Sequence, residues 1–462
     1  MLAGVLPQLL NSVVGERDET MDLTTEQVLA LAPDAASASA GKKLANARSW
    51  KSLGQSTEAV WGECQGSALY QVRVDVRDMT TRCSCPSRKF PCKHSLGLML
   101  LATGTPDVLP QGSPPEWVEE WLGKRAATAA KREERGASRA KTTEADPAAQ
   151  AKRADKRLSL IRAGLDTLDL WMNDLIRSGL AGVETQPATF WEREAARMVD
   201  AQAPGIAARL RTIAGIPNAT PDWPERLLAE LGRLALLTHA FRRLDALDPA
   251  LQEDVRQLIG WALKEDEVVA RGEAVRAEWV VLGQWVDGEE RLRTQRTWLI
   301  STDGARTALV LQFSAAGAPF AQTIVPGTCQ QAELFYWPGA YPQRALIKER
   351  TGNPAPLAGR LPGSATLDGA FATVAQALGR QPWLDRFPFI LADVIPVPNE
   401  GQWQLEDQTG ARLPLTRGDH WRLLALSGGA PVDLAGEWNG TDLLPLGVVV
   451  DGAYHPLGDT QA

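Results

Sequence analysis

The chain contains 462 residues, of which 44% are hydrophobic and 23% are charged, a balance that excludes an intrinsically disordered protein. No run approaches the roughly 18 uncharged apolar residues of a membrane-spanning helix, so we expect no membrane partner and a cytoplasmic protein. Five cysteines are too few for a disulfide scaffold, and four histidines leave little room for a multi-histidine metal centre. The net charge of −7 excludes binding of a polyanion through bulk charge alone.

The N-terminal segment divides at a second methionine, Met21. Residues 1–21 are predicted to be an extension, either disordered or the product of a start codon placed too early. They lack the basic start and the small-residue cleavage site of a signal peptide. Thr24 and Gln27 then have the spacing of a helix capping box, ahead of the apolar run 28–31. A folded module is therefore expected to begin at residue 22.

The module predicted over residues 22–103 combines a hairpin with one helix. Small residues at 35–41 predict a loop, and two strand-like runs follow at 59–64 and 69–76. The second run alternates, so that its apolar side chains share one face. An apolar helix is predicted over 95–102. A two-stranded hairpin and one helix bury too little core to be stable alone, which favours a stabilising metal.

The rest of the chain is predicted as a basic linker (104–157), a helical region (158–270) and a β-rich region (271–462). Prolines and alanines mark the linker, apolar residues at three- and four-residue steps mark the helices, and alternating runs between glycine turns mark the strands. Charge is unevenly distributed, because residues 42–157 hold 21 basic and 13 acidic residues, a net +8. An anionic partner is therefore expected to contact this part of the chain.

The one motif that carries chemistry consists of two short pairs, Cys83-x-Cys85 and Cys92-x-His94. Three thiolates and one imidazole complete the tetrahedral shell that zinc prefers and leave no position for water. We therefore expect one structural Zn²⁺ rather than a catalytic metal. A redox dithiol is the weaker alternative, because it favours a C-x-x-C motif near a βαβ unit.

This arrangement closely resembles the SWIM zinc finger, which has C-x-C, a spacer and C-x-H after a β-hairpin and before a helix. The resemblance covers residues of about 55–103. It implies a zinc-binding module that recognises DNA or another protein. A further cysteine, Cys64, falls on the first predicted strand and is interpreted as a small buried hydrophobic residue, because four ligands are already present.

Basic residues surround the metal motif, namely Arg82, Arg88, Lys89 and Lys93, with Phe90 among them. Such cations could contact phosphates, and Phe90 could stack on an unpaired base. Alternatively, Phe90 covers the apolar side of the metal site, and the cationic side chains only keep the loop hydrated without binding a partner.

Together these patterns predict an α+β protein with a small zinc-stapled ββα finger, a helical middle region and a β-rich C-terminal region. The expected function is recognition, with the finger binding nucleic acid or a protein partner. No catalytic residue and no small-molecule substrate is identified. The alternative is an enzyme of unknown reaction, with its active site in residues 158–462 near Cys329, Asp419 or His420 and the finger as a targeting module. A third possibility is a purely structural finger that holds an assembly surface.

Overall fold

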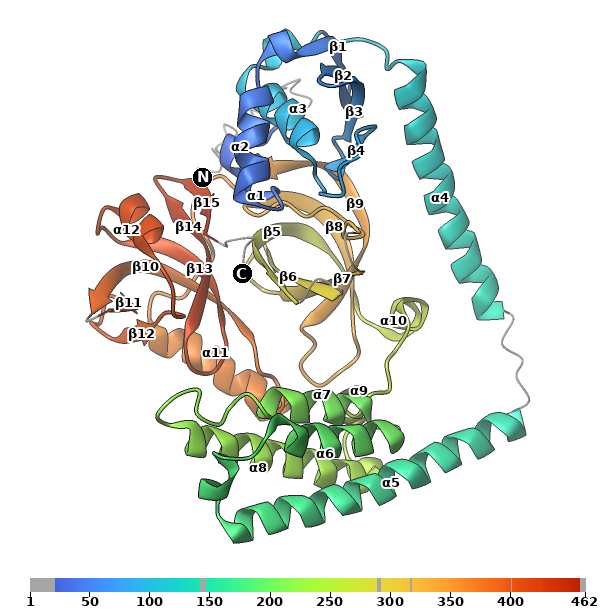
Figure 1. Cartoon of the computed structure of the whole chain (residues 1–462), viewed down its shortest axis with the longest axis vertical. Helices are drawn as coiled ribbons and strands as arrows, with labels where there is room; N and C mark the ends of the chain where they lie inside the picture. The colour runs from blue at the N-terminus through green and yellow to red at the C-terminus, as the bar shows by residue number, and fades with distance from the viewer. Residues whose placement is uncertain (1–20, 142–146, 289–291, 316–317, 400, 458–462) are drawn as a thin grey trace, which may run out of the picture.

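The computed structural model describes residues 21–141, 147–288, 292–315, 318–399 and 401–457 (Figure 1). Its mixed helices and sheets confirm the predicted α+β class. The predicted N-terminal extension, apart from Met21, lies outside the described residues. Within the described ranges, no helix combines the length and the apolar character that crossing a membrane requires.

The finger region holds three helices and one antiparallel sheet. Its elements are α1 (Thr25–Ala30), α2 (Ala35–Leu44), a short 3-10 helix η1 (Ala47–Ser49), β1 (Trp50–Gln55), β2 (Ala59–Gln65), β3 (Leu69–Asp75), β4 (Thr80–Cys83) and α3 (Lys93–Gly104). The Thr24–Gln27 capping box starts α1 as expected, with both reciprocal hydrogen bonds formed. The sheet order is β1-β2-β3-β4, and α3 lies against β2 and β3.

The finger is larger than the sequence predicted, in two respects. Its sheet has four strands rather than two, and the small residues expected to form a loop form α2 instead. Those small residues allow close packing: a Cβ on Gly41 would lie 2.8 Å from the Cβ of Leu96, and one on Gly97 would lie 2.7 Å from the Cβ of Leu44. α2 and α3 therefore approach one another through glycine, and α3 is buried between α2 and the sheet.

The segment predicted as a linker contains helices in the structure. A 3-10 turn η2 (Pro106–Val108) precedes α4 (Glu116–Lys141), and α5 (Pro147–Ser178) begins within the same predicted segment. The start of α4 packs on the finger, where Val118 and Leu122 contact Ala59 and Trp61. In Figure 1 α4 then runs along the side of the molecule towards the helical region.

The predicted boundaries between the modules remain a prediction, which limited proteolysis can test. We expect trypsin to cut first after exposed basic residues such as Lys131, beyond the part of α4 that packs on the finger. The products should be a finger-bearing fragment of roughly 12–15 kDa and a stable larger one. Early cleavage within residues 160–260 would show that the boundary is misplaced.

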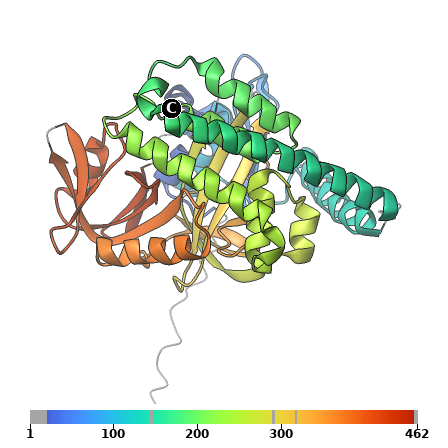
Figure 2. The ribbon, with the colours of Figure 1, turned by 90° about the horizontal axis from the view of Figure 1, so that it is seen from below.

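The helical region forms a bundle across one end of the molecule. Its elements after α5 are η3 (Leu180–Val183), α6 (Ala188–Asp200), α7 (Pro204–Ile213), α8 (Trp223–Arg242), η4 (Leu244–Ala246), α9 (Pro249–Ile259) and α10 (Glu265–Arg271). Leu165, Leu168 and Leu231 are among its fully buried core residues, as the three- and four-residue spacing requires. Figure 2 shows the bundle helices side by side, with α5 extending beyond the others.

The first part of the β-rich region is a closed five-stranded barrel. Its strands are β5 (Ala274–Asp287), β6 (Leu292–Ser301), β7 (Thr307–Ala315), β8 (Thr328–Tyr336) and β9 (Arg344–Pro356). The order around the barrel is β5-β6-β7-β9-β8, with β7 and β9 parallel and the other pairs antiparallel. This order and this single parallel pair are those of an OB-type barrel. Its interior is filled by side chains such as Trp279, Leu334 and Tyr336.

A six-stranded antiparallel sheet completes the chain and packs on the barrel. Its strands are β10 (Phe387–Asn399), β11 (Gln402–Glu406), β12 (Arg412–Pro414), β13 (Val432–Trp438), β14 (Leu443–Val450) and β15 (Ala453–Pro456), accompanied by α11 (Leu367–Arg380) and α12 (Trp421–Ser427). Trp298 of β6 and Leu446 of β14 share one buried cluster. A Cβ on Gly283 would lie 2.5 Å from that of Leu446, so this close approach requires glycine, which also adopts φ +147°.

The finger rests on the barrel through polar and apolar contacts, some of them buried. The Gln27 side chain donates a hydrogen bond of 2.7 Å to the Gly327 carbonyl oxygen, and Gln330 donates one of 2.9 Å to that of Arg77. Val325, from the loop before β8, belongs to the core of the finger. The finger is therefore an integrated part of the fold, which places its metal motif at a fixed position on the body.

Candidate metal centre

The four predicted ligands come from the end of a strand and the start of a helix. Cys83 is the last residue of β4 and Cys85 follows it, while Cys92 is the N-cap of α3 and His94 lies in its first turn. Pairing of β4 with β3 holds Cys83 opposite Val72. We call residues 83–94 the knuckle, because they turn back from β4 into α3.

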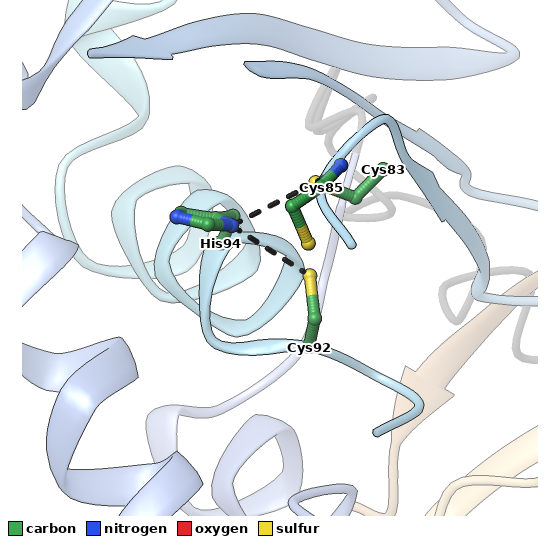
Figure 3. A group of neighbouring side chains, drawn as sticks. All are labelled: Cys83, Cys85, Cys92 and His94. Atoms are coloured by element: carbon green, nitrogen blue, oxygen red, sulfur yellow. Dashed lines mark hydrogen bonds between the residues drawn. The ribbon is translucent and has the colours of Figure 1, made fainter. Parts of the chain in front are cut away.

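The knuckle brings the four side chains together (Figure 3). The Nδ1 atom of His94 lies 3.8 Å from Sγ of Cys83 and 4.0 Å from Sγ of Cys92, and all four ligand atoms lie within 4.8 Å of one another. Zinc bond lengths imply separations of about 3.8 Å between sulfurs and about 3.6 Å between sulfur and nitrogen in a tetrahedron. The donor set and its spacing therefore fit a structural Zn²⁺.

Neighbouring groups fix the ligands and cover them. His94 and Cys92 are buried, and the ring of Tyr70 lies 4.9 Å from the His94 ring, centroid to centroid. Ser95 places its hydroxyl 3.5 Å from the Cys92 sulfur, a contact of the kind that orients a ligand and tunes its basicity. The sequence pattern alone does not indicate a role for Ser95, which stands out there only as the neighbour of His94.

Hydrogen bonding within the metal-free cluster concentrates negative charge on one sulfur. The hydrogen bond from the Cys83 thiol, with smaller help from His94 and Ser95, lowers the pKa of Cys92 to about 3. Donation of that same bond raises the pKa of Cys83, and burial raises the pKa of Cys85. The directions of these shifts favour a thiolate at Cys92 and thiols at Cys83 and Cys85.

Zinc binding is therefore expected to release about two protons near pH 7.5, one from Cys83 and one from Cys85, because zinc is bound by thiolates. The direction of the pH dependence follows from the raised pKa values, because zinc must displace these protons. Zinc affinity therefore falls as the pH falls, and it rises about 100-fold for each pH unit upward. Calorimetric titration of metal-free protein in buffers of different ionisation enthalpy measures this count. Release of no protons would contradict the assignment of these two thiols as ligands.

Such a closed set of three sulfurs and one nitrogen defines a structural zinc site. Comparison with known families then identifies it: the model of the SWIM zinc finger matches residues 70–102. A second model, the SWIM-associated four-helix bundle domain, matches residues 156–259, which span α6 to α9 and most of α5. The predicted SWIM-type finger is confirmed. Neither the curated proteins nor the solved structures provide a match to the chain.

The two remaining cysteines lie outside the metal cluster. Cys64 is 1% exposed in the core of the finger, as its interpretation as a small hydrophobic residue requires, and burial raises its pKa. Cys329 lies on β8, where burial raises its pKa to about 11, so its thiol is protonated at neutral pH.

The residues named for a catalytic alternative serve separate parts of the fold. His420 contacts the Thr416 carbonyl oxygen at 2.8 Å and stands edge-on to Trp403, and Asp419 accepts a hydrogen bond from the backbone of Trp421. Both lie at the start of α12, whereas Cys329 lies in the barrel wall. Their described contacts are those of local structure.

Proposed function

We propose that the finger binds nucleic acid through the cations around the knuckle. The observation that carries this proposal is that Arg82, Arg88 and Lys93 are exposed and form no ion pair within the described part of the chain. At the other end of the sheet, by contrast, Arg77 and Arg125 are both paired with Asp75. Unpaired positive charge therefore lies around the knuckle, and Lys42, Lys43, Arg48 and Lys51 of the finger are likewise exposed and form no ion pair within the described residues.

The charge of the metal site itself does not cancel this surface. Zinc with three thiolates carries about −1, and Asp34 adds another negative charge. The four cations of the knuckle region outweigh both and leave about +2, which favours a polyanion. These four cations are Arg82, Arg88, Lys89 and Lys93.

A protein partner is the other predicted possibility, and the two apolar features in or beside the finger that could serve it are the helix α3 and the pair Trp117 and Trp121. The finger helix α3 is buried from His94 to Ala102. Trp117 and Trp121 both lie under the guanidinium of Arg73, on the sheet. The helix is buried and the two tryptophans are partly covered by Arg73, so these places offer little free apolar area to a protein partner, which supports the nucleic-acid proposal.

The salt dependence of binding tests the proposal. Four phosphate contacts on duplex DNA should give a log–log slope of about −3.6, and about −2.8 on a single strand. Replacing Arg88 and Lys89 with glutamate should lower the magnitude of this salt slope by the contribution of about two phosphate contacts. The zinc content should stay unchanged. The measurement is fluorescence anisotropy of labelled oligonucleotides with the full zinc-loaded chain.

The matched control reverses two exposed arginines of the bundle, Arg162 and Arg177, for which we expect no change in slope. An equal loss of salt slope with this control would show that the nucleic acid is attracted by charge over the whole protein rather than by a surface of the finger. If wild type binds neither DNA nor RNA at low salt, the nucleic-acid proposal fails and a protein partner takes its place.

A further inference from the structure

A groove opens beside the zinc site, between α2, the β2–β3 turn and the knuckle. We propose that this groove holds one phosphate-bearing nucleotide unit of a single-stranded nucleic acid. This inference rests on the proposed nucleic-acid function and names the place where the strand is held. Its volume of about 470 Å³ lies in the range of about 300–1,000 Å³ that is typical of sites for small organic molecules.

The walls of the groove come from three parts of the finger that are distant in sequence. Ala36 and Ala40 of α2 form one wall with short side chains, and Ser67 of the β2–β3 turn lies across from them. Cys85 and His94 also line the groove, so that the zinc site holds one wall in place. Packing of α2 against α3 fixes the first wall relative to the others.

Two lysines supply the positive charge of the groove. Lys93 is exposed and has no ion pair within the described residues, so its ammonium group is available to a phosphate. Lys89 is held 2.5 Å from a carboxylate oxygen of Asp34. Asp34 is itself fixed as the N-cap of α2, because it accepts a 2.6 Å hydrogen bond from the Ser37 amide. Lys89 is thereby positioned at the groove, and Lys93 is the principal phosphate contact.

The uncharged lining suits a base or a sugar. Tyr70 gives the groove an aromatic wall, and its hydroxyl lies 2.7 Å from that of Ser67, where either can also contact a ligand. Ser87 of the knuckle adds a third hydroxyl. A duplex keeps its bases paired and stacked, whereas a single strand can direct one unit into a groove that combines cations with an aromatic ring. The combination therefore selects a single strand over a duplex.

Two pairs of variants of the full, zinc-loaded chain test this inference. Ala36→Trp fills the groove without changing charge, and Ser39→Trp is its control on an exposed position of the same helix outside the groove. Lys93→Gln removes the phosphate contact, and Lys51→Gln removes an exposed charge elsewhere on the finger. The probes are labelled 15-nucleotide oligothymidine, oligouridine of the same length and a 15-base-pair duplex. Zinc content is measured for each variant.

We expect Ala36→Trp to weaken binding of the single strands about tenfold, which is a typical cost of losing one stacked base. Lys93→Gln should reduce the magnitude of the salt slope by about 0.7, as one lost contact on a single strand does. Both controls should bind like wild type. If Ala36→Trp and Ser39→Trp bind with equal affinity while wild type still binds, the groove is not the nucleotide site. The broader proposal of nucleic-acid binding would be unaffected. Absence of binding by wild type would overturn both, and preference for oligothymidine or for oligouridine identifies the strand as DNA or RNA.

Discussion

Replacing Cys92 with serine is expected to reduce the zinc content from about one ion per chain to near zero. Cys92 is buried and is the N-cap residue of α3, and the hydrogen bond from the Cys83 thiol lowers its pKa. A serine hydroxyl does not ionise at neutral pH and is a poor zinc ligand. Apparent zinc-binding free energies of about 10–16 kcal/mol in small finger peptides indicate how much local stability depends on the ion.

The loss should disorder the knuckle and the first turn of α3 while the barrel keeps its structure. The finger buries a core of its own around Val72, Leu96 and Met99, so we expect local opening rather than unfolding of the whole chain. Elemental analysis gives the zinc content, and hydrogen exchange gives the opening of α3. Cys64→Ala is the matched control, because this buried cysteine of the same sheet should leave the zinc in place. Retention of stoichiometric zinc by Cys92→Ser would exclude Cys92 as a ligand.

Glu437→Gln is expected to destabilise the C-terminal half of the molecule by about 1–3 kcal/mol. Glu437 is 2% exposed and accepts hydrogen bonds from the Arg296 guanidinium at 3.1 Å, from Trp298 at 2.8 Å and from Arg386 at 2.6 Å. These contacts join the barrel to the C-terminal sheet. A neutral amide removes one of the two carboxylates that pair with the buried Arg296 guanidinium and leaves only the half-exposed Asp287, and a poorly compensated buried charge is costly.

The measurement is the urea midpoint of the transition seen by tryptophan fluorescence. Its control, Glu406→Gln, breaks the more exposed pair with Arg412 and should cost about 0–1 kcal/mol. Burial alone would raise the pKa of Glu437, but the charges of Arg296 and Arg386 outweigh it and lower this pKa. The stabilisation is therefore complete above the unfolded carboxyl pKa of about 4.3 and is lost as the pH falls through the folded value. Equal midpoints for both variants would show that the cluster does not stabilise the contact between barrel and sheet.

The zinc ligands could be predicted from the sequence because their chemistry is local. Two pairs of ligands lie within twelve residues, so a single turn of the chain is enough to bring all four to one metal ion. The folded knuckle does bring these four side chains together. The helical region was predictable for a similar reason, since its apolar period is long and regular. Strands such as β7 and β14 were partly recognisable from their alternation or apolar runs, bounded by glycine turns.

What the sequence could not supply was the set of contacts between distant segments. Residues 35–41 are small and weakly amphipathic, and they become helical because Gly41 and Gly97 let α2 dock on α3. The strand order of the barrel depends on pairing of β5 with β8 and of β7 with β9, which no local pattern encodes. The groove beside the zinc site joins α2, β3 and the knuckle in the same way, so its two lysines could be named while the cavity could not.

X-ray absorption at the zinc edge of the purified full chain tests the central claim most directly, namely that Cys83, Cys85, Cys92 and His94 form a closed structural shell. Three sulfur scatterers at about 2.3 Å and one nitrogen at about 2.0–2.1 Å, with no water oxygen, are the expected result. Such a shell leaves the metal no open position for chemistry and assigns it to holding the finger in shape. An oxygen scatterer in a shell with fewer than three sulfurs would contradict this account and would point to a reactive zinc site.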